Sequence, residues 1–395
     1  MKILVITPGI YPDSHSGIPK LVYYMSKNFV KNGHEVYVLT RRYNIEHPEN
    51  EEIEKIQYNR INIPKRGDYN HLFWPIVGAV RCKNYLLNNK NDKFDFIWIH
   101  SPWMIFFTNI KKIWPSAKIF FDLHFRPSEE ILSNHRKTII NLFIGKLFDW
   151  VTIKGIKKSH SVIVHSNYVK KQAIKMIREK NKTINIINGG ADKDLFSLCR
   201  DSELEVLREK NNIPSNREIF ITVRGLKKRT GVEQLIKACY RLTQLKINYF
   251  LIIIGSGKIK NQLNNLINNL SLDKNIRIIS NINEKELSDY YKLSDVFVLP
   301  TQGGEGFGLA TTEALASGLI TFGTNNGATE EILKKYNKNW IIDGCSEEDI
   351  YKKLKDYYFN KDDYFLKKEI IKKITTENFS WENLSQDLIK IVNTL

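Results

Sequence analysis

Two glutamates whose side chains could bind a ligand or take part in a reaction, Glu305 and Glu313, stand eight positions apart in GEGFGLATTEALASG, residues 304–318. This glycine-rich segment follows an apolar run that ends at Leu299. Glycine lets the backbone approach a ligand closely, and the first N–H groups of a helix can bind an anion. We expect Glu305 to face a ligand from a loop and Glu313, about one turn into a helix, to accept hydrogen bonds from two hydroxyl groups. The alternative is structural, with Glu305 stabilising the helix dipole and Glu313 pairing with a lysine.

A basic cluster follows another apolar run. Arg224-Gly-Leu-Lys-Lys-Arg-Thr-Gly231 comes directly after Ile219–Val223 and contains Arg224, Lys228 and Arg229. Fixed cations at the end of a strand can stabilise negative charge that develops on a leaving phosphate group. The alternative is a solvated basic turn.

Histidines end two further apolar runs, in Phe121-Asp-Leu-His124 and in Ile99-His-Ser-Pro102. A neutral histidine can hydrogen-bond a substrate hydroxyl group, although a lone histidine is often structural. His124 and His100 are therefore both candidates, whereas His15 is interpreted as a surface-loop residue.

The sequence predicts no metal site and no cofactor. Asp192-Lys-Asp194 has the form of a metal motif, but it falls inside the longer segment Ile187–Phe196. The four cysteines form no CxxC pair, so we interpret them as reduced thiols of a cytosolic protein. They are Cys82, Cys199, Cys239 and Cys345.

The elements that would position these residues form two series of strands with helices between them. The first series comprises Lys2–Thr7, His34–Thr40, Phe94–Ile99, Lys118–Asp122, Ser161–His165 and Ile184–Ile187. The second comprises Ile219–Val223, Tyr249–Ile254, Ile276–Ser280, Val296–Leu299 and Ile320–Thr324. Helical spacing marks Pro19–Lys31, Val232–Gln244, Leu287–Leu293 and Thr311–Ser317. This alternation predicts an α/β protein with parallel sheets, in which ligands sit outside the carboxyl ends of the strands.

The chain length of 395 residues fits two domains. We interpret the polar stretch Asn188–Leu207 as the region between them. Residues 1–200 and 201–375 are therefore predicted to form one domain each, facing each other across a cleft that suits a ligand.

The net charge of +17 comes from 60 basic and 43 acidic residues. The lysines are scattered along the chain. Two explanations of the positive charge therefore remain open, compositional bias and attraction to an anionic membrane, whereas nucleic acid is disfavoured as a partner. In the stretch Asn134–Lys158, apolar side chains share a face that would dock on a membrane or face the core. They are Ile140, Ile144, Leu147 and Val151. No run of eighteen apolar residues exists, so no membrane-spanning helix is expected, and MKILVIT is interpreted as a strand because no cleavage site follows it.

The segment from Glu305-Gly-Phe-Gly-Leu to Glu313-Ala-Leu-Ala-Ser-Gly318 resembles the acid–seven residues–acid motif of retaining GT-B glycosyltransferases of the group 1, family 4-like type. The resemblance covers most of the chain and is strongest from 185 to 335. Further matching segments are Ser294–Pro300, Asn326–Leu333 (with Glu330 where proline is usual), Gly255-Ser-Gly257, Ile187–Phe196 and Phe379-Ser-Trp381. The implied fold has two Rossmann-like, doubly wound domains facing a cleft, and a last helix, 381–395, that returns to the first domain.

The resemblance also implies roles in binding a sugar donor. Glu305 would approach the hydroxyl groups of the donor sugar, and Glu313 would hold the nucleotide ribose. The N–H groups of Phe307, Gly308 and Leu309 would meet the diphosphate.

Two basic residues and a glycine complete the implied donor site. Arg224 would bind the diphosphate; Thr230 stands where a lysine is usual, so we expect Arg229 to replace it, with Lys228 as the alternative. Of two glycines usual near the diphosphate only Gly17 is present, and Ile18 replaces the other.

The catalytic candidates are therefore His124, near the reacting centre, and Glu305, Arg224 and Arg229. The implied reaction moves a hexosyl group from a nucleoside diphosphate sugar to a hydroxyl of a glycan or lipid-linked acceptor, with retention and without a metal, in polysaccharide biosynthesis. We expect a cytoplasmic protein, peripheral on the inner face of the membrane. The alternatives are a GT-B sugar-nucleotide epimerase or phosphorylase, and a non-catalytic basic module that binds membrane or nucleic acid.

Overall fold

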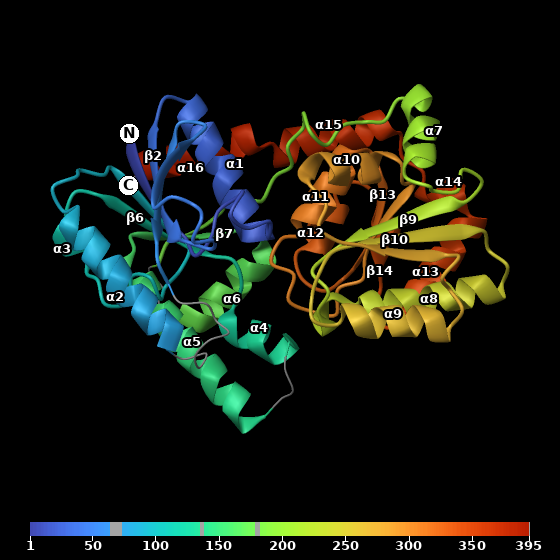
Figure 1. Ribbon diagram of the computed structural model, residues 1–395, viewed down its shortest axis with the longest axis horizontal. Helices are drawn as coiled ribbons and strands as arrows, with labels where there is room; N and C mark the ends of the chain where they lie inside the picture. Colours follow the sequence, from blue (N-terminus) through green and yellow to red (C-terminus); the bar gives the residue numbers. More distant parts are fainter. Residues whose placement is uncertain (64–72, 135–137, 178–181, 395) are drawn as a thin grey trace. The chain divides into compact units, whose positions relative to one another are not determined.

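The computed structural model describes residues 1–63, 73–134, 138–177 and 182–394. The chain divides into two compact units (Figure 1). The first unit comprises Met1–Leu132, Lys137–Asn188 and Trp381–Leu395, and the second comprises Ser133–Arg136 and Gly189–Ser380.

The first unit contains an eight-stranded sheet in the order β3-β4-β2-β1-β5-β6-β7-β8. The strands are β1 (Lys2–Ile6), β2 (Glu35–Arg41), β3 (Asn50–Ile53), β4 (Ile56–Ile61), β5 (Phe96–Ile99), β6 (Lys118–Leu123), β7 (Ser161–Val164) and β8 (Ile184–Ile186). All neighbouring strands are parallel except β3 and β4, which form an antiparallel hairpin at the edge. The chain winds outward from β1 on one side and from β5 on the other, so the topological switch point lies between these two strands.

Helices cover both faces of this sheet. They are α1 (Gly17–Lys31), α2 (Phe73–Asn88), α3 (Ile110–Ile113), α4 (Pro127–Asn134), α5 (Ile139–Lys158), α6 (Asn167–Ile177) and α16 (Trp381–Asn393). On one face Phe29 of α1 packs against Phe96 and Trp98 of β5. The last helix, α16, lies beside α1, where the Trp381 ring stacks on Tyr24 with ring centroids 5.7 Å apart.

The second unit contains a six-stranded parallel sheet in the order β11-β10-β9-β12-β13-β14. The strands are β9 (Glu218–Val223), β10 (Tyr249–Ile254), β11 (Ile276–Ile279), β12 (Val296–Leu299), β13 (Ile320–Thr324) and β14 (Ile341–Ile342). The chain winds outward from β9 and then from β12, so the switch point lies between β9 and β12.

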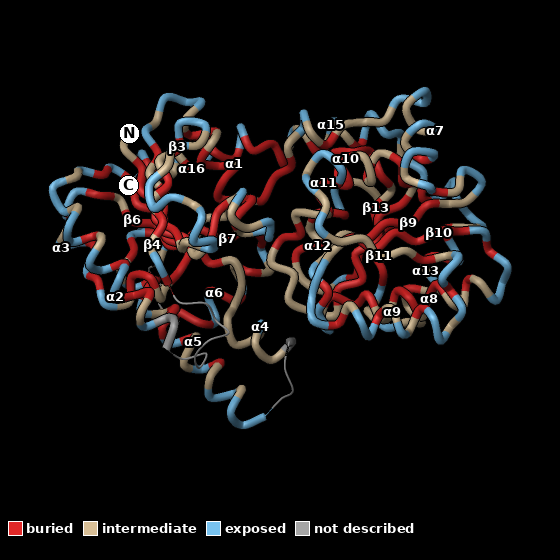
Figure 2. Tube along the Cα trace, viewed as in Figure 1, coloured by how far each residue is buried: buried red, intermediate tan, exposed pale blue. Residues whose placement is uncertain are grey.

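The helices of the second unit also lie on both faces of its sheet. They are α7 (Asp201–Lys210), the 3-10 turns η1 (Lys228–Thr230) and η2 (Lys338–Trp340), α8 (Val232–Gln244), α9 (Lys260–Asn269), α10 (Glu284–Lys292), α11 (Leu309–Ala316), α12 (Thr329–Leu333), α13 (Glu347–Phe359), α14 (Lys361–Tyr364) and α15 (Lys368–Phe379). In Figure 1, α8, α9 and α13 lie on one side of the sheet, and α10 and α11 lie on the other. Figure 2 shows the strands buried and the outer helix surfaces exposed.

The structure corrects several boundaries. The hairpin of β3 and β4, the short strand β14 and helix α7 were not predicted, and α7 begins inside the stretch assigned to the interdomain region. The first unit ends at Asn188 instead of near residue 200. The reason is local packing in the second unit: Ala191 N–H donates to the Phe379 carbonyl at 3.0 Å, and a Cβ on Gly189 would lie 2.5 Å from Phe307.

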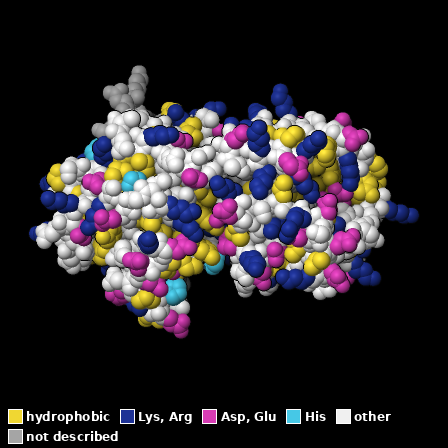
Figure 3. Space-filling view, turned by 90° about the horizontal axis from the view of Figure 1, so that it is seen from above, with side chains coloured by type: hydrophobic (Ala, Val, Ile, Leu, Met, Phe, Trp, Pro, Cys, Tyr) yellow, Lys and Arg dark blue, Asp and Glu magenta, His cyan; other side chains and the backbone are white. Residues whose placement is uncertain are grey.

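The face shown in Figure 3 carries Lys and Arg side chains that are scattered and interspersed with Asp and Glu. Among the described residues, no helix combines the length and the apolar character needed to cross a bilayer.

The apolar residues predicted to share a face lie on one helix, α5, but they differ in exposure along it. Ile140 is 71% exposed, whereas Val151, on the same side of the helix, is 1% exposed. The first turns of α5 therefore present apolar residues to solvent, and only its later turns pack against the core.

Candidate active site

Arg224 and Glu305 form an ion pair at the switch point of the second unit. Arg224 follows β9 and Glu305 lies in the loop after β12; because these strands are parallel neighbours, their carboxyl ends lie side by side. Arg224 Nη2 donates to Glu305 Oε2 at 2.7 Å and Nη1 donates to Thr301 Oγ1 at 2.6 Å. Burial lowers the pKa of Arg224, and the Glu305 carboxylate opposes that change.

Arg229 binds the backbone of the same loop. Its Nη1 donates to the Gly304 carbonyl at 2.8 Å, and Gln302 N–H donates to the Arg229 carbonyl at 2.9 Å. Thr230, at the position where the resemblance leads one to expect lysine, is buried, and its hydroxyl donates to the Lys227 carbonyl at 2.6 Å. Lys228 is exposed. Of the two residues considered as replacements for that lysine, Arg229 is thus the one that joins Arg224 in contacting the Glu305 loop.

Glycines allow other backbone segments to approach the Arg224 segment and the Glu305 loop closely. A Cβ on Gly255 would lie 1.8 Å from the Arg224 carbonyl oxygen, and one on Gly257 would lie 2.2 Å from that of Leu226. Gly327 has φ of +95°, and a Cβ there would lie 2.4 Å from the Glu305 carbonyl oxygen. Only glycine lets these backbone segments approach so closely.

The loop after Glu305 leads into α11, and three backbone N–H groups at this junction could bind a ligand. Phe307 is buried against Phe379, with ring centroids 5.8 Å apart. Gly308, with φ of +95° and ψ of 65°, is the N-cap. Within the described chain, the N–H groups of Phe307, Gly308 and Leu309 have no hydrogen-bond acceptor. They remain available for an anionic ligand.

Glu313 lies in the second turn of α11 and is buried. Its Oε2 accepts a hydrogen bond from the Tyr291 hydroxyl at 3.0 Å. Burial raises the pKa of Tyr291 well above its usual value, and the Glu313 carboxylate adds to the increase. Tyr291 was not predicted as part of this site, because nothing in the spacing of α10 shows that it meets Glu313.

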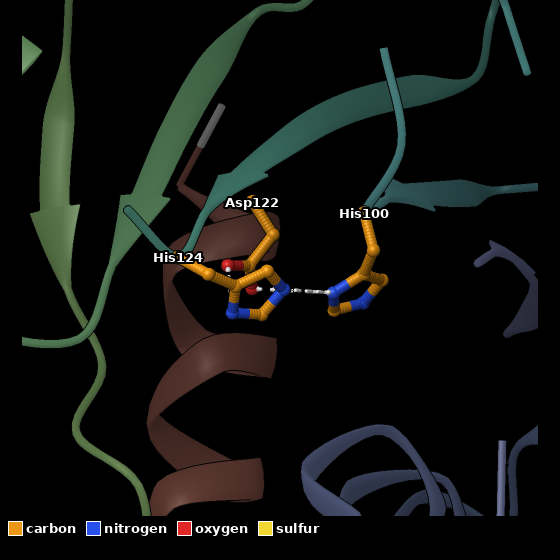
Figure 4. Close-up of side chains that lie close together, drawn as sticks. All are labelled: His100, Asp122 and His124. Carbon is orange, nitrogen blue, oxygen red and sulfur yellow. Dashed lines mark hydrogen bonds and ion pairs between the residues drawn. The ribbon is translucent and has the colours of Figure 1, made fainter. Parts of the chain in front are cut away.

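In the first unit, three neighbouring parallel strands each end in a histidine. His100 follows β5, His124 follows β6 and His165 follows β7. His100 Nδ1 and His124 Nε2 lie 2.9 Å apart (Figure 4). His124 Nδ1 lies 3.4 Å from Asp122 Oδ1, an atom that is also 2.7 Å from His165 Nε2.

Burial and charge give these histidines different protonation states. Burial lowers the pKa of His124 to about 3, against the pull of Asp122, and it lowers the pKa of His100 well below its usual range. Burial alone would lower the pKa of His165, but attraction to the Asp122 carboxylate together with the hydrogen bonds to Asp122 and Ile187 outweighs it, so this pKa is raised. Burial alone would raise the pKa of Asp122, but attraction to the neighbouring histidines, His165 first, together with the hydrogen bonds from His165 and Trp98 outweighs it, so this pKa is lowered. His124 is therefore neutral at ordinary pH.

The roles of Asp122 and His165 were not predicted from the sequence. The available signal was the repeated histidine at the ends of three predicted strands, two of which were considered separately.

His100, Asp122 and His124 place one ligand atom each within 4.8 Å of one another, which is close enough for a metal ion. The 2.9 Å between the two imidazole nitrogens is, however, a hydrogen-bond distance. A shared proton satisfies both nitrogens without a metal.

In Asp192-Lys-Asp194, Asp192 Oδ1 accepts hydrogen bonds from the N–H groups of Asp194 and Leu195 at 3.0 and 3.1 Å, which makes Asp192 a turn residue.

Gly17 is exposed and is the first residue of α1. The loop before it is anchored by the buried Asp13 carboxylate, which accepts from Arg60 Nε at 2.6 Å and Nη2 at 3.1 Å. His15 is exposed. The candidate residues thus divide between the two units. The set in the second unit comprises Arg224, Arg229, Glu305, Phe307, Gly308, Leu309 and Glu313, and the set in the first unit comprises Gly17, His100 and His124.

Comparison with protein families accounts for both units. Residues 203–375 match the model of glycosyl transferases group 1, and residues 15–195 match that of glycosyltransferase family 4. The chain belongs to the group 1, family 4-like glycosyltransferases.

Relatives cover most of this glycosyltransferase. It is 24% identical over 400 residues to an uncharacterized glycosyltransferase of Methanocaldococcus jannaschii, covering 99% of this chain and 97% of that protein. It is 26% identical over 326 residues to alpha-monoglucosyldiacylglycerol synthase of Acholeplasma laidlawii, covering 79% of this chain and 78% of that protein.

Solved structures share the fold. Sucrose-phosphate synthase of Thermosynechococcus elongatus has a TM-score of 0.83 at 14% identity, covering 100% of this chain and 98% of that one. Anabaena HepE in complex with UDP-glucose has a TM-score of 0.77 at 14% identity, covering 100% of both chains. The predicted α/β GT-B fold of the glycosyltransferase is confirmed.

Proposed function

We propose that this glycosyltransferase transfers a hexosyl group, with retention, from a nucleoside diphosphate sugar to a hydroxyl group of a glycan or lipid-linked acceptor. The observation that carries the proposal is the Arg224–Glu305 pair beside the free N–H groups of Phe307, Gly308 and Leu309. A cation, a carboxylate and backbone donors at one switch point match the charges and hydroxyl groups of such a donor. The complex of Anabaena HepE with UDP-glucose supports this choice of donor.

In this proposal the diphosphate binds at Arg224 and at the N-terminus of α11. Breaking the sugar–phosphate bond leaves negative charge on the diphosphate, and fixed cations and N–H groups stabilise that charge. Arg229 fixes the Gly303–Gly304 backbone and adds positive potential. These groups supply the charge stabilisation, so we propose no metal cofactor.

The two glutamates would bind hydroxyl groups. Glu305, oriented by Arg224, would accept hydrogen bonds from the donor sugar. Glu313, oriented by Tyr291, would accept them from the ribose. Gly17 would bring the α1 N-terminus near the diphosphate.

His124 would bind a hydroxyl group of the acceptor or of the donor sugar. Because its pKa is lowered to about 3, it acts as a neutral hydrogen-bond partner. The acceptor hydroxyl would then attack from the side of the leaving diphosphate, which takes up its proton.

The acceptor would be presented at the cytoplasmic face of a membrane, on which the glycosyltransferase is peripheral. The first turns of α5 expose Ile139, Ile140 and Phe143, and the exposed Lys146 follows on the same helix. Apolar side chains beside a cation suit an anionic lipid surface. The lipid product in the name of the Acholeplasma relative supports a lipid-linked acceptor.

The test is a transfer assay with UDP-, GDP- and ADP-hexoses and a lipid extract or glycan acceptor. Released nucleotide is measured, and NMR of the product gives its anomeric configuration. A product with the configuration of the donor supports the proposal. An inverted product, or nucleotide release in none of the combinations, contradicts it. Arg224→Ala should abolish release, whereas Arg241→Ala, on the far end of α8, should not.

A further inference from the structure

The partners of His165 fix its charge. Its Nδ1 lies 2.7 Å from the Ile187 carbonyl oxygen and its Nε2 lies 2.7 Å from Asp122 Oδ1. Both partners are hydrogen-bond acceptors, so both nitrogens must carry a proton. His165 is thus an imidazolium ion, buried within the first unit.

Asp122 is the matching anion. Its Oδ1 faces His165, and its Oδ2 accepts the indole N–H of Trp98 at 3.1 Å. The side chain of Asp122 is completely buried. Buried charges persist when they are paired and hydrogen-bonded, and this carboxylate satisfies both conditions.

The carboxylate selects the tautomer of His124. His124 Nδ1 lies 3.4 Å from Asp122 Oδ1. At this distance the negative carboxylate attracts a proton on Nδ1 and repels a lone pair there. With the proton on Nδ1, His124 Nε2 holds a lone pair and accepts from His100 Nδ1–H at 2.9 Å. His100 Nε2 then also holds a lone pair, and it is buried without a partner among the described residues.

We propose that Asp122 and His165 are positioning residues that lock His124 as a hydrogen-bond acceptor at Nε2. His100 occupies that acceptor in the free protein, and a substrate hydroxyl replaces the His100 N–H when it binds. The site therefore recognises a group that donates a hydrogen bond, and it rejects a carbonyl, an ether or a fluorine at the same position. The inference rests on the proposed function in one respect, namely that His124 contacts a substrate.

The direct test needs no substrate. Long-range proton–nitrogen NMR of the full chain, labelled with ¹⁵N-histidine, distinguishes protonated from unprotonated ring nitrogens. Signals are assigned with His100→Gln, His124→Gln and His165→Gln. We expect two protonated nitrogens on His165, and on His124 a protonated Nδ1 with an unprotonated Nε2. A proton on His124 Nε2, or a neutral His165 at pH 6, would overturn the proposal.

Variants test the role of the ion pair. Asp122→Asn should remove one proton from His165 and broaden or shift the His124 signals, whereas Asp295→Asn, which breaks the Arg208 ion pair in the second unit, should leave both unchanged. Unchanged signals in Asp122→Asn would overturn the proposal. If that variant does not fold, the wild-type spectrum and His165→Gln still decide the question. Addition of equimolar Zn²⁺ should not shift the His100 and His124 nitrogens, and stoichiometric shifts would establish a metal site instead.

Kinetics separate positioning from simple structural support. With an active donor, Asp122→Asn should lower kcat by at least about tenfold and leave the KM of the nucleotide sugar within about threefold, because Arg224, Arg229 and the α11 N–H groups, which would hold the diphosphate, lie in the second unit and do not contact Asp122. An unchanged kcat would overturn the role in transfer. Because the spectra are recorded without substrate, a protein inactive with every donor contradicts the proposed function and leaves the tautomer test intact.

Discussion

Arg224 Nη2 and Glu305 Oε2 lie 2.7 Å apart, although 81 positions separate the two residues in the chain. They meet because β9 and β12 are neighbours at the point where the sheet reverses its winding direction. The guanidinium bonds Thr301 and Glu305 through two different nitrogens, so its plane is fixed before any ligand arrives. Such a fixed cation is suited to a diphosphate, since no reorganisation is needed on binding.

Arg224→Lys should weaken nucleotide diphosphate binding by roughly tenfold, about 1.4 kcal/mol. A lysine keeps the charge but has no fork that reaches Thr301 and Glu305 together. Titration calorimetry with the nucleotide measures the change. Arg241→Lys is the matched control, because Arg241 pairs with Glu348 away from the loop, and equal affinities in wild type and Arg224→Lys would refute the expectation.

Gly327→Ala should destabilise the Glu305 loop by about 1–3 kcal/mol and weaken nucleotide binding. The residue has a left-handed φ, and the new Cβ would meet the Glu305 carbonyl oxygen at 2.4 Å. Urea unfolding gives the free energy of unfolding. At Gly225 an added Cβ meets no atom within 4 Å, so Gly225→Ala should be nearly neutral. Similar losses in both variants would argue against loop distortion as the cause.

The α/β class and the central strands of both sheets follow from apolar runs that alternate with helical spacing, because buried parallel strands are apolar on both faces. The sequence also places Arg224, Glu305 and His124 after such runs. It does not show which strands are neighbours, so the Arg224–Glu305 contact came only from the structure. Tyr291 was missed for a related reason: its contact with Glu313 depends on how α10 packs against α11.

The hairpin of β3 and β4 was missed because its edge strand Asn50–Ile53 is polar. In the same way the charged helix α7 lacks a strong apolar face, and its start at Asp201 is hidden in a polar stretch. The network around Asp122 could be suspected from three histidines at strand ends, but the protonation of each depends on distances of a few ångströms.

The stability of the glycosyltransferase should fall as the pH falls below about 6.5. In the unfolded chain His100 and His124 bind protons near that pH, whereas in the folded protein their pKa values are lowered, that of His124 to about 3. The unfolded state therefore binds more protons in this range, and the free energy of unfolding decreases with acid. His165 acts with the opposite sign: its pKa is raised, so its stabilising contribution is complete below about 6.5 and is lost as the pH rises through its folded value.

His124→Asn isolates one of these contributions. Removing one histidine that charges only on unfolding should reduce the slope of the free energy against pH by up to about 1.4 kcal/mol per unit between pH 4 and 6. Urea unfolding at a series of pH values measures the slope. The same slope in variant and wild type would mean that His124 is protonated in the folded protein.

The double variant Ile140→Asp, Phe143→Asp should lose sedimentation with vesicles that contain phosphatidylglycerol. Both side chains are largely exposed, at 71% and 69%, so their replacement costs little stability, while it places two negative charges against an anionic surface. Val206→Asp, on the exposed face of α7, is the control for charge alone. Unaltered vesicle binding by the double variant would exclude α5 as the docking element.

Binding of a nucleotide sugar at Arg224 and Glu313 is the central claim, and a thermal-shift screen tests it most directly. UDP, GDP, ADP and their hexose conjugates are added to wild type, Arg224→Ala, Glu313→Ala and the control Arg241→Ala. The account predicts that one nucleotide raises the Tm of wild type and of the control, and that both site variants lose the increase. No increase with any nucleotide, or an increase that persists in both site variants, would contradict it.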